Sequence, residues 1–189
     1  MTAKTNSLKK TLAETDTTND LTSLLLDEFK AAFRNHPAGV SLITADAGEG
    51  PVALTATSVF SVSVTPPILA FSVSELSSAT PTIRKAETVI VHLLNANELT
   101  FAKLGATSGI DRFADTSLWS RLESGEPYFT AVQVWIRCRI VNRMEVGGST
   151  VIAVQALQTS AQKGADENST NPLVYHNRKW HQLGEHSVI

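Results

Sequence analysis

Two long runs of strand-forming residues, separated by only two glycines, constrain the fold of this chain more than any other feature. The runs are VQVWIRCRIVNRMEV (residues 132–146) and STVIAVQALQTS (149–160), with Gly147-Gly148 between them. Strand-like runs on either side of a Gly-Gly pair are typical of a β-hairpin. The chain is therefore expected to contain a long antiparallel ribbon.

Most of the remaining chain also has strand patterns. Further runs are GVSLITA (39–45), TATSVFSVSV (55–64), ILAFSVS (68–74), TVIVHLL (88–94) and PLVYHNRKWHQL (172–183), the last predicted to be a short hairpin around Asn177-Arg178. Helices are expected at 20–34, with Asp20 as N-cap and an end at His36-Pro37, at 77–87, and at 97–106, capped by Asn95 or Asn97. Because the helices do not alternate with the strands, the pattern favours a mainly β fold over a doubly wound parallel sheet. The expected form is a closed antiparallel barrel with flanking helices.

The composition is that of a globular protein, with 189 residues, 42% hydrophobic and 18% charged, and a net charge of −2. Residues 1–19 are predicted to be a flexible tail, and residues 20–186 a single domain. The charge balance argues against nucleic-acid or membrane partners, and the start of the chain has no signal-peptide pattern, so a cytoplasmic location is expected. A lone cysteine, Cys138, and histidines without ligand spacing make a metal site improbable.

The stretch from Thr55 to Val64 raises a question of function. With a period of two, Ala56, Phe60, Val62 and Val64 fall on one face, whereas Thr55, Thr57, Ser61 and Ser63 fall on the other. The polar face carries hydroxyls and no charge, so it faces either solvent, as edge strands often do, or a ligand. Ser58-Val59 interrupts the alternation, as a bulge would.

The segment SSATPTIR (77–84) is a candidate anion site. Thr80 is expected to be the N-cap of a short helix and Pro81 its first residue, with Arg84 one turn later. Free N–H groups, hydroxyls and a guanidinium would suit a phosphate, but a capped surface helix with an incidental arginine has the same pattern. Neither a G-x-G-x-x-G nor a P-loop motif occurs in the chain, so a nucleotide-like ligand would be held in another way.

Four segments in order, HPAGVSLITA, LTATSVFSVSVTPPILAFSV, SSATPTIRKAETVIVHLL and NPLVYHNRKWHQL, resemble the flavin reductase-like proteins of the FMN-binding split-barrel class. The resemblance runs from about Phe33 to Leu183. It implies a six-stranded antiparallel split barrel, usually a homodimer, with flavin near the subunit interface. The implied activity is hydride transfer from NADH or NADPH to FMN or FAD. The reduced flavin would then serve a monooxygenase component or react with oxygen.

The resemblance also implies where the flavin lies. Thr55, Ala56, Thr57 and Ser58 would follow the isoalloxazine ring and ribityl chain, Ser72, Val73 and Ser74 would border the flavin, and Ser78, Thr80 and Arg84 would lie near its phosphate. Arg112 and Phe113 match a pair that helps to shape the active-site entrance. The phosphate assignment favours the anion-site interpretation of residues 77–84. No catalytic acid or base is strictly required, because the flavin carries the chemistry.

One turn departs from the family pattern. Many of these reductases have Gly-Asp-His between the last long strands, with the histidine near the nicotinamide, whereas this chain has Gly147-Gly148-Ser149. Gly148 and Ser149 are thus the expected nicotinamide-side residues, without carboxylate or imidazole. Two alternatives follow: an FMN-binding flavoprotein without nicotinamide-dependent reductase activity, or a non-catalytic split-barrel protein that binds a planar ligand.

Overall fold

The computed structural model describes residues 17–161 and 171–189, with side chains from residue 26 onward. The chain divides into two units, with the boundary between His36 and Pro37. The first contains helix α1 (Thr17–Arg34), which begins three residues before the predicted N-cap Asp20. Residues 1–16 of the predicted tail lie outside the described residues. No helix in the described part of the chain is long and apolar enough to span a bilayer.

The second unit is mainly β, as predicted. Its strands are β1 (Ala38–Gly39), β2 (Ser41–Asp46), β3 (Pro51–Ala56), β4 (Phe60–Val64), β5 (Pro67–Ser74), β6 (Thr88–Leu93), β7 (Trp119–Arg121), β8 (Pro127–Phe129), β9 (Val134–Val146), β10 (Ser149–Thr159), β11 (Leu173–His176) and β12 (Lys179–Gln182). Its helices are α2 (Thr80–Lys85) and α3 (Leu99–Ala106), with one-turn 3-10 helices at η1 (Ala96–Glu98) and η2 (Glu185–Ser187). The side chain of Asn95 caps η1, accepting a hydrogen bond from the Asn97 N–H at 2.9 Å, which confirms one of the two predicted caps.

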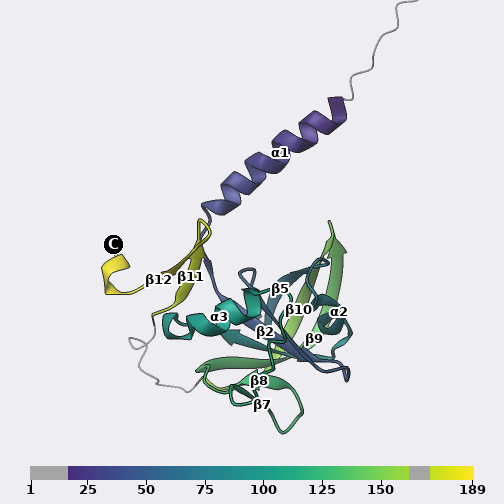
Figure 1. The fold of residues 1–189 in the computed structure, drawn as a ribbon, viewed down its shortest axis with the longest axis vertical. Helices are drawn as coiled ribbons and strands as arrows, with labels where there is room; N and C mark the ends of the chain where they lie inside the picture. The colour runs from purple at the N-terminus through teal and green to yellow at the C-terminus, as the bar shows by residue number, and fades with distance from the viewer. Residues whose placement is uncertain (1–16, 162–170) are drawn as a thin grey trace, which may run out of the picture. The chain divides into compact units, whose positions relative to one another are not determined.

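Across residues 17–161 and 171–189, the main sheet has seven strands in the order β3-β2-β6-β9-β10-β5-β4, all antiparallel, rather than the six expected. The hairpin predicted at Gly147-Gly148 is its longest ribbon, β9–β10, and both glycines have positive φ. The sheet curls so that β3 and β5, far apart in strand order, contact each other and enclose the same core. Figure 1 shows this curled sheet with α3 across one side.

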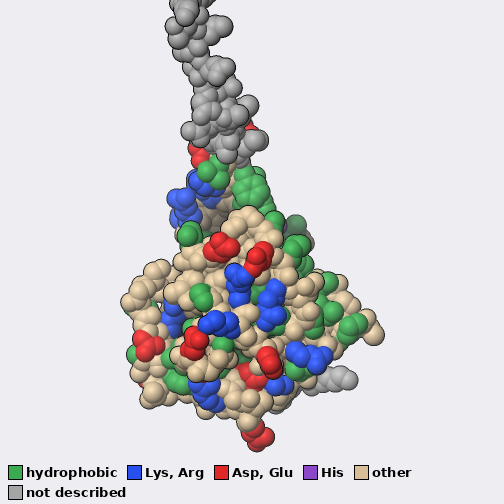
Figure 2. Space-filling model, turned by 90° about the vertical axis from the view of Figure 1, so that its right-hand side faces the viewer, with side chains coloured by type: hydrophobic (Ala, Val, Ile, Leu, Met, Phe, Trp, Pro, Cys, Tyr) green, Lys and Arg blue, Asp and Glu red, His purple; other side chains and the backbone are tan. Residues whose placement is uncertain are grey.

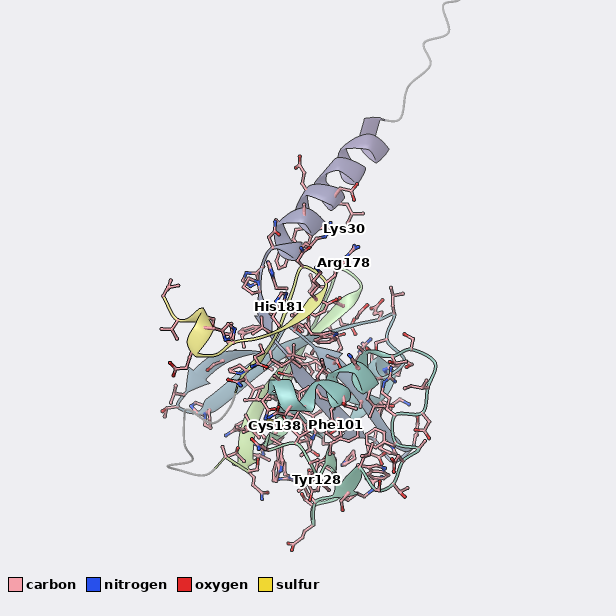
Figure 3. The ribbon with its side chains drawn as sticks, turned by 60° about the vertical axis from the view of Figure 1, so that its left-hand side comes forward. Lys30, Phe101, Tyr128, Cys138, Arg178 and His181 are labelled. Atoms are coloured by element: carbon pink, nitrogen blue, oxygen red, sulfur yellow. The ribbon has the colours of Figure 1, made fainter. Side chains whose placement is uncertain are left out.

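Hydrophobic cores lie on both sides of β2. The inner core, within the curled sheet, consists of Ile43, Ala45, Leu54, Ala56, Phe71, Val73, Ala79, Ile83, Ala86, Val89, Val91, Cys138, Ile152 and Val154. The outer core, beneath α3 and the β7–β8 hairpin, consists of Val40, Leu42, Ala53, Leu94, Phe101, Ala102, Phe113, Phe129, Val132 and Leu173. Cys138 and Phe101 mark the two cores in Figure 3. Strand β2 is buried on both faces and contacts α2, α3 and β8, while β3 pairs with it along one edge.

The stretch Thr55–Val64 is two strands rather than one. Strand β3 ends at Ala56, residues 57–59 belong to no strand, and β4 begins at Phe60. The predicted apolar face was therefore wrong beyond Ala56: Phe60, Val62 and Val64 are 56%, 56% and 84% exposed. The reason is position, because β4 is an edge strand that pairs only with β5 and lies outside the inner core.

The chain's C-terminal hairpin forms a separate small sheet. Strands β11 and β12 pair around Asn177-Arg178, and both turn residues have positive φ, as the predicted tight turn requires. Strand β1 adds to this sheet through Ala38 and Gly39.

Candidate functional site

The break between β3 and β4 leaves a run of unpaired backbone donors. Among the described residues, none accepts a hydrogen bond from the N–H groups of Thr57, Ser58 or Val59. The Ser58 hydroxyl joins the break to β5, because it accepts from the Ser72 N–H at 3.0 Å and donates to the Ser72 carbonyl at 3.3 Å. The break is therefore held in place by one side chain while its own N–H groups stay available to a ligand.

Helix α3 fixes the other end of this break. The Thr55 hydroxyl donates to the Ala102 carbonyl at 2.7 Å, so it is engaged within the fold. Gly105 allows this close approach: a Cβ there would lie 2.3 Å from Leu42 Cδ1 and 2.4 Å from Thr55 Oγ1. Because the Thr55 hydroxyl is already hydrogen-bonded, the predicted contact of Thr55 with a ligand would have to be made by its backbone.

Arg112 and Phe113 lie in the loop that follows α3, the helix that contacts Thr55. Arg112 donates to the carbonyls of Gly105 at 3.2 Å and Thr107 at 2.6 Å, which ties it to the C-terminal end of α3. Phe113 is buried in the outer core, stacked on Phe129 with ring centroids 5.3 Å apart. Both residues therefore hold the loop after α3 against the helix that supports Thr55.

The end of β5 meets the β9–β10 turn. Ser74 pairs with Ser149, and the Glu75 N–H donates to the Gly148 carbonyl at 3.1 Å. Val73, between Ser72 and Ser74, points into the inner core, so the residues of β5 that face outward here are the two serines. The predicted nicotinamide-side residues Gly148 and Ser149 thus lie beside the segment that leads into α2.

Helix α2 begins one residue earlier than its sequence suggested. The N-cap position is Ala79, with no side-chain cap, and Thr80 is the first helical residue. Thr80 is buried, and its hydroxyl donates to the Ser74 carbonyl at 2.6 Å. The prediction of Thr80 as N-cap was therefore wrong, because the hydroxyl closes the turn after β5 instead. Ser78 remains exposed, two residues before the first helical residue.

Arg84 projects from α2 into a surface hollow of about 430 Å³, lined by Glu75, Thr80, Pro81, Arg84 and Lys85. Its guanidinium forms an ion pair with Glu145 on β9, and Lys85 Nζ lies 3.0 Å from Glu49 Oε1. The helix lies beside β9 and β10 (Figure 1), and Arg143 donates to the Ala86 carbonyl at 2.7 Å. Sequence reasoning missed Glu75, which lines the hollow, and Glu145, which pairs with Arg84, because their positions depend on the turn after β5 and on strand register.

Apart from Val73 and Phe113, which lie in the two hydrophobic cores, the predicted site residues lie in segments joined into one strip. Hydrogen bonds connect its successive parts, from Arg112 through α3 to Thr55, from the break to Ser72, and from Ser74 to α2. Within the part of the chain that is described, no three His, Cys, Asp or Glu side chains are grouped to hold a metal ion.

Two buried titratable groups lie away from the strip. His92 is fully buried, with Nδ1 2.9 Å from the Leu42 carbonyl and Nε2 accepting from the Phe129 N–H at 3.1 Å, and burial lowers its pKa to about 4. Burial raises the pKa of the Cys138 thiol to about 12. A neutral imidazole and a protonated thiol both suit structural roles rather than chemistry.

Comparison with known proteins identifies the family to which this fold belongs. A family model described as flavin reductase like domain matches residues 33–184. The chain belongs to this family. A flavin reductase-like relative named NADH:FMN oxidoreductase, from Rhodococcus erythropolis, is 37% identical over 161 residues, covering 85% of this chain and 83% of the relative. Another relative, named FMN reductase (NADH) RutF, from Methylorubrum extorquens, is 35% identical over 159 residues, covering 82% and 74% of the two chains.

Solved structures of flavin reductases share the fold of this flavin reductase-like chain. The crystal structure of a flavin reductase domain protein from Arthrobacter sp. FB24 has a TM-score of 0.76 at 30% identity, covering 84% of this chain and 95% of that one. The Streptomyces globisporus NADH:FAD oxidoreductase SgcE6, solved with NAD and FAD fragments, has a TM-score of 0.73 at 22% identity, covering 93% and 100%. The second likeness supports the fold alone.

Proposed function

We propose that this protein is an NADH-dependent flavin reductase that transfers a hydride to FMN. The relatives that cover most of the chain are named for this activity, and the described strip suits a flavin. The observation that carries the proposal is the break at residues 57–59, where three consecutive N–H groups are available beside small hydroxyl side chains. A flat, polar-edged ring system needs donors of this kind and close approach to the backbone.

The residues of the chain fit a flavin at both ends of the strip. The break after β3 would donate to the polar edge of the ring, with Thr55 held by α3 and Ser58 held by Ser72. The hollow at α2 would take the phosphate, with Arg84 and Lys85 as its cations. The bound flavin supplies the hydride chemistry, and the protein's part is to bind it, orient it and leave one face open to the nicotinamide.

Further parts of the proposal rest on the family. We propose that the enzyme is a homodimer, as the resemblance implies. We also propose that it delivers reduced flavin to a monooxygenase component, since solved neighbours include the nitrilotriacetate monooxygenase component B homologue from Mycobacterium thermoresistibile and the flavin reductase component BorF of a tryptophan halogenase. All of the flavin-site assignments, from Thr55 to Phe113, and those on the nicotinamide side stay predictions, as does the cytoplasmic location.

A second candidate function is an FMN-binding flavoprotein that takes its electrons from another source. The Gly147-Gly148-Ser149 turn favours it, because the turn forms in the structure but carries neither a carboxylate nor an imidazole. Such a protein would use the same strip to bind FMN and would lack only the nicotinamide step.

An anaerobic titration separates these functions. Purified protein is titrated with FMN while flavin fluorescence is followed, and NADH or NADPH is then added while absorbance near the flavin band is recorded. The reductase is expected to bind FMN and to bleach it with NADH. Binding without bleaching by either nucleotide, with full bleaching by dithionite, would favour the second function. Absence of FMN binding would reject both.

A further inference from the structure

The hollow at α2 is more acidic than a phosphate site would require. Both of its cations already have carboxylate partners, because Arg84 pairs with Glu145 and Lys85 pairs with Glu49. Glu75 adds a third carboxylate to the wall. Two cations and three carboxylates give these groups a formal charge of 2 − 3 = −1. Figure 2 shows the face on the α2 side of the molecule, where basic side chains are interspersed with acidic ones.

The backbone at Glu145 is held close to α2, which carries Arg84. Strand β9 is fixed next to α2 by Arg143, which donates to the Ala86 carbonyl at 2.7 Å, and Glu145 itself pairs in register with the buried Thr150. The hydroxyl of Thr80 is engaged with Ser74 and adds no free donor. A phosphate in the hollow would therefore meet Arg84 with the Glu145 carboxylate still close by.

We infer that Glu145 sets the affinity of the hollow for phosphorylated flavins by competing with the phosphate for Arg84. The inference rests on the proposed function. The Arg84–Glu145 pair is solvent-accessible, with side-chain exposures of 37% and 63%, and pairs of this kind are weak. A phosphate monoester, with a charge of about −1.5 to −2 at pH 7, would displace the Glu145 carboxylate from Arg84. The carboxylate would remain nearby and repel the bound phosphate, because both groups are negatively charged. Glu145 thus lowers retention of FMN without any contact to the ring.

The test compares FMN with riboflavin, which has the same ring and ribityl chain but no phosphate. Dissociation constants for both are measured by fluorescence quenching with the wild type, Glu145→Gln, Arg84→Ala and the double variant. Glu123→Gln, in the exposed turn between β7 and β8, is the control for loss of one negative charge.

Glu145→Gln is expected to bind FMN about five- to tenfold more tightly and riboflavin with unchanged affinity, whereas Glu123→Gln changes neither. In the Arg84→Ala background, Glu145→Gln should have little effect, because the competition requires the guanidinium. In steady state, Glu145→Gln should lower the KM for FMN while kcat stays the same, and the difference from wild type should shrink at high salt.

Three results would overturn the inference: unchanged or weaker FMN binding by Glu145→Gln, an equal gain for riboflavin, or an equal gain in the Arg84→Ala background. In each case the wild type still binds and reduces FMN, so the proposed function stands. A wild type that binds neither flavin rejects the proposed function, and the inference with it.

Discussion

At the scale of single residues, Thr150 places a hydroxyl in the interior without a partner. The residue is fully buried, and Thr150 Oγ1 makes no hydrogen bond within the described chain. It lies on the inner face of β10, in register with the core residue Val73 on β5. A buried hydroxyl without a partner lowers stability by its desolvation cost.

Thr150→Val should therefore raise the free energy of unfolding, by about 1 kcal/mol, since valine keeps the shape and removes the hydroxyl. Urea denaturation measures the change. Thr44→Val is the matched control: Thr44 is equally buried, but its hydroxyl donates to the Pro127 carbonyl, so this variant should lose about 1–3 kcal/mol. A destabilised Thr150→Val would show that the hydroxyl has a partner, such as an internal water.

His92 makes stability depend on pH. Its pKa is about 4 in the folded chain, below the ordinary 6.5, because the ring is buried among Leu42, Phe129 and neighbouring strands. Protons therefore bind the unfolded chain first as the pH falls. The stability that depends on the neutral ring is complete above pH 6.5 and is lost as the pH falls towards 4.

Between pH 7.5 and 4.5, His92 should account for a loss of about 2–3 kcal/mol in the free energy of unfolding. His92→Gln, whose amide can donate to Leu42 and accept from Phe129, should show a smaller loss, and the exposed His181→Gln should match the wild type. If His92→Gln does not fold, NMR titration of the wild type gives the same answer: a His92 ring that titrates near pH 6.5 would contradict the structure.

The sequence pattern indicated where free backbone donors lie, but it did not indicate which distant residues pair with each other. The interruption of alternation at Ser58-Val59 pointed to the break after β3, because a change of periodicity is visible along the chain. The pairing of Ser58 with Ser72, and of Arg84 with Glu145, joins residues that are distant in sequence. Such contacts follow from sheet register, which a single sequence does not specify here.

At the scale of elements, the contact between α3 and β3 depends on one glycine. A Cβ at Gly105 would meet a methyl group of Leu42, the hydroxyl of Thr55 and, at 3.0 Å, the backbone nitrogen of Thr55. The last of these cannot be relieved by a change of rotamer. Helix α3 therefore sets the position of the strand end from which the proposed flavin-binding break begins.

Gly105→Ala should destabilise the fold by about 1–3 kcal/mol, despite the better helix propensity of alanine, because the helix must move away from β3. It should also weaken FMN binding by displacing Thr55. Thermal unfolding and fluorescence titration measure the two effects. Gly39→Ala is the control, since a Cβ there meets nothing within 4 Å, and it should leave both unchanged. Equal behaviour of the two variants would mean that α3 does not pack as closely as described.

The sequence predicted the strands of the two hairpins correctly, but it mispredicted the buried face of β4, which lies at the edge of the main sheet. The β9–β10 hairpin and the terminal hairpin were visible from their turn residues, and the mainly β, antiparallel class followed from them. The stretch Thr55–Val64 misled, because alternation continues across a break in the strand. Exposed Phe60 and Val62 have the pattern of core residues, and only the position of β4 at the sheet edge shows that they are not.

At the scale of the whole molecule, the outer face of the sheet carries apolar side chains that the single chain does not cover. Phe60 pairs with Ala70, which pairs with Ala153, while Val151 pairs with Met144 in the neighbouring row. All five point away from the inner core; Ala70 is already buried within the chain, whereas Phe60 and Met144 are each 56% exposed. Exposed apolar patches of this kind mark interaction sites, and a second copy of the chain is the occupant that the proposed homodimer requires.

The proposed homodimer should therefore depend on this face. Light scattering after gel filtration is expected to give about twice the chain mass of 20.3 kDa for the wild type. Phe60→Glu combined with Met144→Glu should give the mass of one chain, because burying two carboxylates at a symmetric interface without partners costs several kcal/mol. Val188→Glu, at an apolar residue near the C-terminus that is 77% exposed, should stay dimeric. A double variant that remains a dimer would place the interface elsewhere.

A monomeric double variant that still binds FMN would show that the strip is complete within one chain, whereas loss of FMN binding together with dimerisation would mean that the second copy completes the site.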